Sequence, residues 1–146
     1  MMMGRDLCGL PVFSWVKGSY LGRVADFFID NEKKALGGIS LGKSFSGKRI
    51  LWVDEKKILK IYKDGIIIAS PSDLKKIRDV GFDHVSYHDF TCNAQIFLKE
   101  GEIISDLVFD QQYVISGYEI SGGLWKDLAD GRKFYPRYDK IGQISK

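Results

Sequence analysis

The sequence lacks the features that mark secreted or membrane-spanning proteins. It has two cysteines in 146 residues, Cys8 and Cys92, which form no CxxC pair and are too few for a disulfide framework. We expect both to be reduced, packed thiols. No apolar run approaches the ~18–20 residues that cross a bilayer, and Asp6 interrupts the short apolar start, which excludes a secretory signal there. We therefore expect a cytoplasmic protein with no membrane insertion.

The sequence also gives little support for a catalytic or nucleotide-binding site. No GxGxxG pattern occurs. Residues 37–44 match the spacing GxxxxGK[ST], but a phosphate loop opens a helix and none is expected after Ser44, so we interpret Gly42-Lys43-Ser44 as part of a β-hairpin loop. With only two histidines, no Ser-His-Asp or Cys-His arrangement stands out. The sequence predicts a protein that is not an enzyme and that carries no cofactor.

The charge is unevenly spread along the chain. Residues 1–80 hold 15 Lys and Arg against 9 Asp and Glu, whereas residues 81–146 hold 7 against 10. The basic excess peaks between residues 43 and 63, where Trp52 and Tyr62 lie among lysines. Basic groups interleaved with aromatics can bind single-stranded nucleic acid, but lysines also protect an exposed edge strand, in which case Trp52 belongs to the core. The residues of this stretch that we take as a possible partner surface are Lys43, Lys48 and Arg49.

Short apolar runs separated by Gly, Asp and Asn turns predict strands rather than helices. The predicted strands are 11–15, 20–30, 35–41, 49–53, 58–62 and 66–69. One helix is expected afterwards, because Ser70 can cap it, Pro71 suits its first position and Gly81 can end it. Six short strands and a terminal helix indicate a small barrel.

The second half repeats part of the first. A shift of 80 residues places Val24–Asp30 on Ile104–Asp110, and the same shift places Gly37 on Gly117. An internal repeat governs the fold assignment. We predict a mainly β protein of two tandem small barrels, with a short helix after the first, spanning residues 5–82 and 83–146.

Residues 18–26 together with Ile29-Asp30 resemble the signature of the PRC-barrel family, a glycine turn followed by Leu-Gly-x-Val-x-Asp. The residues that carry it are Gly18, Leu21, Gly22, Val24, Asp26 and Asp30, and in the second half Asp106, Asp110 and Gly117. The resemblance implies protein docking rather than catalysis, as in a photosynthetic reaction-centre subunit and a ribosome maturation factor. The second half has Gly101-Glu102 instead of Leu-Gly and no terminal helix, so we expect its sheet to be completed by the first barrel or by a second copy of the chain.

Two groups of side chains invite a chemical function. The paired aspartates of the repeat suit acid–base chemistry, but at strand ends we expect them to accept backbone amide hydrogen bonds. His84, His88 and Cys92 are spaced four apart and could hold zinc on a helix. Their segment is predicted to be a linker and first strand, so we expect solvated histidines and no metal.

Large side chains near predicted loops are candidates for contacts with another protein. They are Trp15, Trp125, Phe134 and Tyr135, with Arg132 beside them. Either they pack between the two halves or they form a partner surface, where such residues are enriched. The sequence thus predicts a docking or adaptor module for an unidentified protein, with self-association as a further possibility. The alternative is an accessory protein of RNA or the ribosome that uses the basic stretch.

Overall fold

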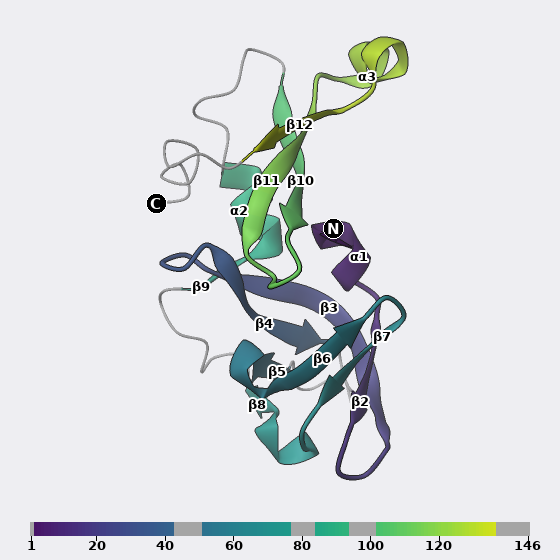
Figure 1. Cartoon of the computed structure of the whole chain (residues 1–146), viewed down its shortest axis with the longest axis vertical. Helices are drawn as coiled ribbons and strands as arrows, with labels where there is room; N and C mark the ends of the chain where they lie inside the picture. The colour runs from purple at the N-terminus through teal and green to yellow at the C-terminus, as the bar shows by residue number, and fades with distance from the viewer. Residues whose placement is uncertain (1, 43–50, 77–83, 94–101, 137–146) are drawn as a thin grey trace.

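The computed structural model describes residues 2–42, 51–76, 84–93 and 102–136, which form two β-sheets (Figure 1). The prediction of a mainly β protein is confirmed. In chain order the elements are β1 (Met2–Met3), α1 (Gly4–Leu7), β2 (Pro11–Ser14), β3 (Tyr20–Asp30), β4 (Ala35–Leu41), β5 (Leu51–Asp54), η1 (Glu55–Lys57), β6 (Ile58–Tyr62), β7 (Gly65–Ile68), η2 (Pro71–Asp73), β8 (Lys75–Lys76), β9 (His84–Ser86), α2 (Tyr87–Asn93), β10 (Ile103–Phe109), β11 (Ile115–Ser121), α3 (Leu124–Asp130) and β12 (Lys133–Pro136).

The larger sheet runs in the order β6-β7-β2-β3-β4-β5-β8, with β9 paired to the C-terminal end of β3. Neighbouring strands within this sheet are antiparallel, except that β2 and β7 are parallel to each other. No hydrogen-bonded pairing joins β6 to β8 within the described residues, so this sheet is not a closed barrel by its strand pairing.

The predicted helix after the first barrel is wrong over its described residues. Ser70 does cap a turn, with its Oγ accepting from Ser72 N and its amide donating to Asp73. That turn is the single 3₁₀ turn η2, and it leads into the short strand β8, which pairs with β5. The capping residues act locally, but strand pairing replaces the helix. Residues 77–83 of the predicted helix lie outside the described residues.

The smaller sheet has the order β1-β10-β11-β12, so its first strand comes from the start of the chain. A second barrel is not shown by the structure. The division between residues 82 and 83 falls within residues 77–83, outside the described residues, and remains a prediction. Met2–Met3 extends the sheet of the second half, while His84–Ser86 extends that of the first.

The repeated segment forms two hairpins of the same construction, β3–β4 and β10–β11. Each hairpin has two bulges. In β3–β4 they lie between Val24 and Asp26 and between Phe28 and Ile29. In β10–β11 they lie at the equivalent places, between Ile104 and Asp106 and between Val108 and Phe109. The register pairs Gly38 with Phe28 and Gly117 with Val108. Gly117 therefore corresponds to Gly38, and not to Gly37 as the simple shift predicts.

The two hairpins meet at their turns. Leu36 N donates to Tyr113 O at 2.9 Å, and Ile115 N donates to Lys34 O at 2.8 Å. Lys34 and Tyr113 both have positive φ values, 54° and 60°. The reciprocal bonds and matching backbone place the hairpins about a local twofold relation, which joins the two sheets.

A single apolar core crosses from one sheet to the other. The Phe27 ring stacks on Tyr87 with centroids 4.4 Å apart and meets Phe109 edge-on at 5.7 Å. The core residues include Val12, Phe27, Ile39, Val53 and Ile66 of the larger sheet and Leu107, Phe109, Ile115 and Tyr118 of the smaller one. Among the described residues, the helices are too short or too polar to span a bilayer.

Candidate functional site

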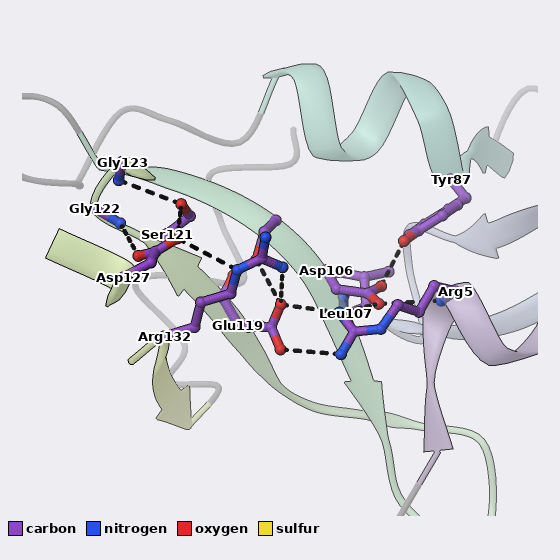
Figure 2. A network of polar contacts seen from close by, with 11 residues as sticks. Arg5, Tyr87, Asp106, Leu107, Glu119, Ser121, Gly122, Gly123, Asp127 and Arg132 are labelled. Atoms are coloured by element: carbon purple, nitrogen blue, oxygen red, sulfur yellow. Dashed lines mark hydrogen bonds and ion pairs between the residues drawn. The ribbon is translucent and has the colours of Figure 1, made fainter. Parts of the chain in front are cut away.

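A buried carboxylate, Asp106, lies where α1, α2 and β10 meet (Figure 2). Its Oδ1 accepts from Leu107 N at 2.7 Å and from the Tyr87 hydroxyl at 2.5 Å. Its Oδ2 accepts from Arg5 N at 3.1 Å, with Arg5 Nη1 at 3.4 Å. A buried charge requires such partners, so Asp106 fastens the start of the chain and α2 to the second sheet.

Glycine is required where the N-terminal helix approaches Asp106. A Cβ at Gly4 would lie 2.6 Å from Asp106 Oδ1 and 2.8 Å from the Tyr87 ring. Burial, followed by the hydrogen bond to Asp106, raises the pKa of the Tyr87 hydroxyl above its ordinary value of 10. Tyr87 therefore stays protonated and acts as a donor.

Cys8 lies next to this cluster as a free thiol. Burial, aided by the carboxylates of Asp26 and Asp106, raises the pKa of Cys8 to about 11. The thiolate is the nucleophilic form of cysteine. At neutral pH Cys8 is consequently a neutral, poorly reactive group.

Glu119 on β11 forms the centre of a second, more exposed cluster. Its Oε1 accepts from Arg5 at 3.0 Å, from Arg132 at 2.9 Å and from Ser105 Oγ at 2.8 Å. Burial opposes ionisation of Glu119, but the hydrogen bonds from Arg5, Ser105 and Arg132 outweigh it and lower its pKa to about 2. Glu119 is therefore ionised at neutral pH and holds both arginines in place (Figure 2).

Arg132 is also held from its other side by Asp127 on α3. Arg132 Nε lies 3.4 Å from Asp127 Oδ2, and Asp127 in turn accepts from Ser121 Oγ at 2.6 Å and from Gly122 N at 3.0 Å. The Ser121 hydrogen bond is the main cause of a lowered Asp127 pKa. Within the described part of the chain, Arg132 Nη2 makes no hydrogen bond.

A hollow of about 240 Å³ adjoins this arginine. Its lining combines apolar and cationic side chains with one carboxylate: Met3, Val108, Phe134, Arg132, Lys133 and Glu119. The Phe134 ring is 49% exposed and lies against Gly117, where an added Cβ would come within 2.4 Å of it. The site is thus an ionic network that positions Arg132 beside an open apolar hollow.

The structure brings together some of the predicted partner residues. Arg132 and Phe134 lie at the hollow, and Tyr135 is half-buried against the core. Trp125 belongs to α3, but its side chain lies outside the described residues, as do Lys43, Lys48 and Arg49. Sequence reasoning missed Arg5, Glu119 and Asp127, because nothing local distinguishes them from ordinary surface charges.

The basic stretch offers less to nucleic acid than its sequence indicates. Trp52 is 5% exposed and packs in the core, its ring 6.4 Å from that of Phe28. It is not available for base stacking. Tyr62 is exposed and carries Lys60 over its ring at 5.1 Å.

The histidines and cysteine that suggested a metal site lie on different elements. His84 is in β9, whereas His88 and Cys92 are in α2. The His84 ring packs against Gly37 and is 6.3 Å from the ring of Trp52. Among the described side chains, no three such groups are arranged to hold a metal ion.

The signature residues lie in the β2–β3 and β3–β4 hairpins. Gly18 and Gly22 have φ values of 62° and 138°, Leu21 is half-buried and Val24 is buried. Asp26 Oδ1 accepts from Phe27 N at 2.8 Å; its pKa is raised, mainly by burial, with that bond acting in the opposite direction.

The aspartates that end β3 and follow β10 have matching contacts. Asp30 Oδ1 accepts from the amides of Glu32 and Lys33. Asp110 Oδ1 accepts from the amides of Gln112 and Val114. Each carboxylate thereby orders the tight turn that follows it.

These hairpins belong to a recognised class of small β-domain, and comparison with known proteins gives the family. The PRC-barrel domain model matches residues 1–75, and the chain belongs to this family. The chain is also similar to the uncharacterized protein YrrD of Bacillus subtilis (strain 168), with 25% identity over 142 residues, covering 94% of this chain and 80% of YrrD.

Proposed function

We propose that the chain is a non-catalytic docking module that receives a protein partner in the hollow beside Arg132 and Phe134. The observation that carries this proposal is the fixed position of Arg132, held by Glu119 at 2.9 Å and by Asp127 at 3.4 Å. A side chain ordered before binding loses less conformational entropy when a partner engages it. Arginine and aromatic residues are also the side chains that contribute most at protein interfaces.

The chemistry of the hollow indicates what the partner presents. Phe134, Met3 and Val108 supply an apolar surface, while Arg132 and Lys133 supply positive charge at its margin. The one carboxylate in the lining, Glu119, is already neutralised by two arginines. The matching partner is a protein segment with an apolar anchor next to a carboxylate, which would accept from Arg132 Nη2.

Site-directed photocrosslinking in native cells tests this proposal. A benzophenone amino acid is placed at Phe134 and, as the control, at Tyr62, which is similarly exposed on β6. A defined adduct from position 134 that survives nuclease and weakens with Arg132→Gln supports docking. Absence of an adduct, the same adducts from both positions, or adducts that depend on RNA would contradict it. An adduct with a second copy of this chain would make self-association the docking event.

A further inference from the structure

The β2–β3 hairpin exposes a set of apolar side chains at the other end of the molecule. Figure 1 shows this hairpin projecting from the larger sheet on the side away from the smaller sheet. Its turn carries Trp15, 70% exposed, and Val16, 67% exposed. Phe13 and Tyr20, on the adjoining ends of β2 and β3, are also exposed. These values leave most of both tip side chains in water.

The pleat of the sheet explains why these side chains face outward together. Phe13 pairs with Tyr20 on one side and with Ile67 on the other, and Ile67 pairs with Lys60. Directly paired residues share one face of a sheet, so these four form one row. The intervening residues Val12, Ile66 and Ile68 are fully buried on the opposite face.

Five backbone amides of the tip donate hydrogen bonds within the protein. Ser14 N donates to Ser19 O, Gly18 N to Ser14 O and Lys17 N to Ser14 Oγ. Trp15 N and Val16 N donate to the carbonyls of Ile68 and Ala69 at 2.8 and 3.1 Å. The tip can therefore leave water without depriving these five amides of an acceptor, which lowers the cost of entering the headgroup region.

Positive charge predominates around the tip, although Asp73 lies on the neighbouring turn, where it accepts from Ser70 N. Residues 7–25 contain no Asp or Glu, and their only charged side chains are Lys17 and Arg23. Lys57 is adjacent, because its carbonyl accepts from Ala69 N, and Lys60 lies in the exposed row. Cations beside exposed tryptophan and tyrosine match the interface of an anionic bilayer.

We propose that the β2–β3 tip adsorbs to anionic membrane surfaces, with Trp15 and Val16 entering the headgroup region and Lys17, Lys57 and Lys60 facing lipid phosphates. This is adsorption of a preformed hairpin and spans nothing. The apolar contact and the electrostatic attraction would each bind the membrane weakly alone, so binding depends on the apolar tip and the cations together. The site is separate from the docking hollow, and the two proposals stand or fall independently.

Co-sedimentation of the whole chain with lipid vesicles tests the proposal. One set contains phosphatidylcholine and phosphatidylglycerol in equal amounts, and the other contains phosphatidylcholine alone. We expect binding to the anionic vesicles at low salt, little to the neutral ones, and weakening as salt is added. Brominated lipid should quench Trp15 fluorescence in a variant whose other tryptophans are phenylalanine.

Substitutions at the tip separate specific adsorption from general basicity. The Trp15→Ser, Val16→Ser double variant should have an affinity for the anionic vesicles lower than that of the parent chain by about tenfold or more. Lys17→Gln should lower this affinity about fivefold. Leu128→Ser is the matched control, since Leu128 is 71% exposed on α3, and it should leave binding unchanged. Arg132→Gln should also bind vesicles normally while weakening the docking adduct formed from position 134.

Three results would overturn the proposal. The first is that the parent chain does not sediment with anionic vesicles at low salt. The second is that the tip double variant, with an unchanged thermal midpoint, sediments as well as the parent. The third is that the same variant loses binding to a single-stranded RNA oligonucleotide while vesicles never bind, which would assign this face to nucleic acid.

Discussion

Replacing Asp106 with asparagine changes one oxygen of a fully buried side chain into an amide group. Asparagine can still accept from Leu107 N and the Tyr87 hydroxyl through its remaining oxygen. Its NH₂ group then replaces Oδ2 and faces the amide of Arg5, which donates to that oxygen at 3.1 Å. Two donors would then face each other at a fully buried position.

The magnitude follows from the contacts that are lost. A hydrogen bond to a charged group contributes about 1.5–3 kcal/mol, and a buried donor left without an acceptor costs about 1–3 kcal/mol. The ion pair with Arg5 adds little, because the Arg5 side chain is 53% exposed. We expect the free energy of unfolding to fall by about 3 kcal/mol, which corresponds to a Tm lower by about 6–12 °C for a chain of this size.

The equivalent residue of the first hairpin supplies a matched control. Asp26 is half-buried and accepts from Phe27 N through the same oxygen, Oδ1. Asp26→Asn keeps that bond and should cost less than about 1 kcal/mol. Urea unfolding followed by tryptophan fluorescence measures both variants. Equal losses for Asp26→Asn and Asp106→Asn would refute the reasoning from burial and hydrogen bonding.

Three further predictions concern pH, reactivity and packing. The pKa of Glu119 is lowered from an ordinary 4.5 to about 2, so ionised Glu119 stabilises the fold by about 1–2 kcal/mol after solvent screening, fully above about pH 4.5 and less as the pH falls towards 2. Glu119→Gln should remove this part of the acid dependence in urea titrations. An unchanged pH profile of stability would contradict the prediction. Because the pKa of Cys8 is about 11, its thiol should react with iodoacetamide at pH 8 about two orders of magnitude more slowly than that of a free cysteine. The rate is measured in a variant lacking Cys92. Equal rates would show that the Cys8 thiolate is accessible. Gly38→Ala should destabilise the chain by about 1–3 kcal/mol because the new Cβ would lie 2.6 Å from Val53 O. Gly42→Ala is the control and should shift the thermal midpoint little, because the nearest atom to its new Cβ lies 3.9 Å away. Similar shifts of the thermal midpoint for both variants would rule out the steric explanation.

Some of the fold could be predicted because its determinants are local. The strands at 20–30, 35–41 and 58–62 occur with the predicted bounds, since alternating apolar residues and turn residues specify both pleat and ends. The repeat of Val24–Asp30 at Ile104–Asp110 also locates two hairpins with matching bulges. In each case the information lies within a dozen neighbouring residues.

Other features depend on contacts between distant segments. Ser70 caps a turn as its sequence indicates, but the residues after it pair with β5, and the helix does not form. Tyr87 and His88, predicted as part of a linker and first strand, begin the helix α2, and Tyr87 donates to Asp106. The predicted interface residues Arg132 and Phe134 do meet at one hollow, yet their partner Glu119 could not have been chosen from the sequence.

The sequence by itself determined the β-hairpins, their turns and the family to which they point, because strand alternation and turn geometry are set by adjacent residues. Only the tertiary structure decided that Met2–Met3 joins the sheet of the second half and that Arg5 meets Glu119, 114 positions away. It also decided that Trp52 is buried while Trp15 projects into solvent. The physical reason is that burial and ion pairing depend on which faces the folded sheets bring together, and neighbouring residues in the sequence do not specify those faces.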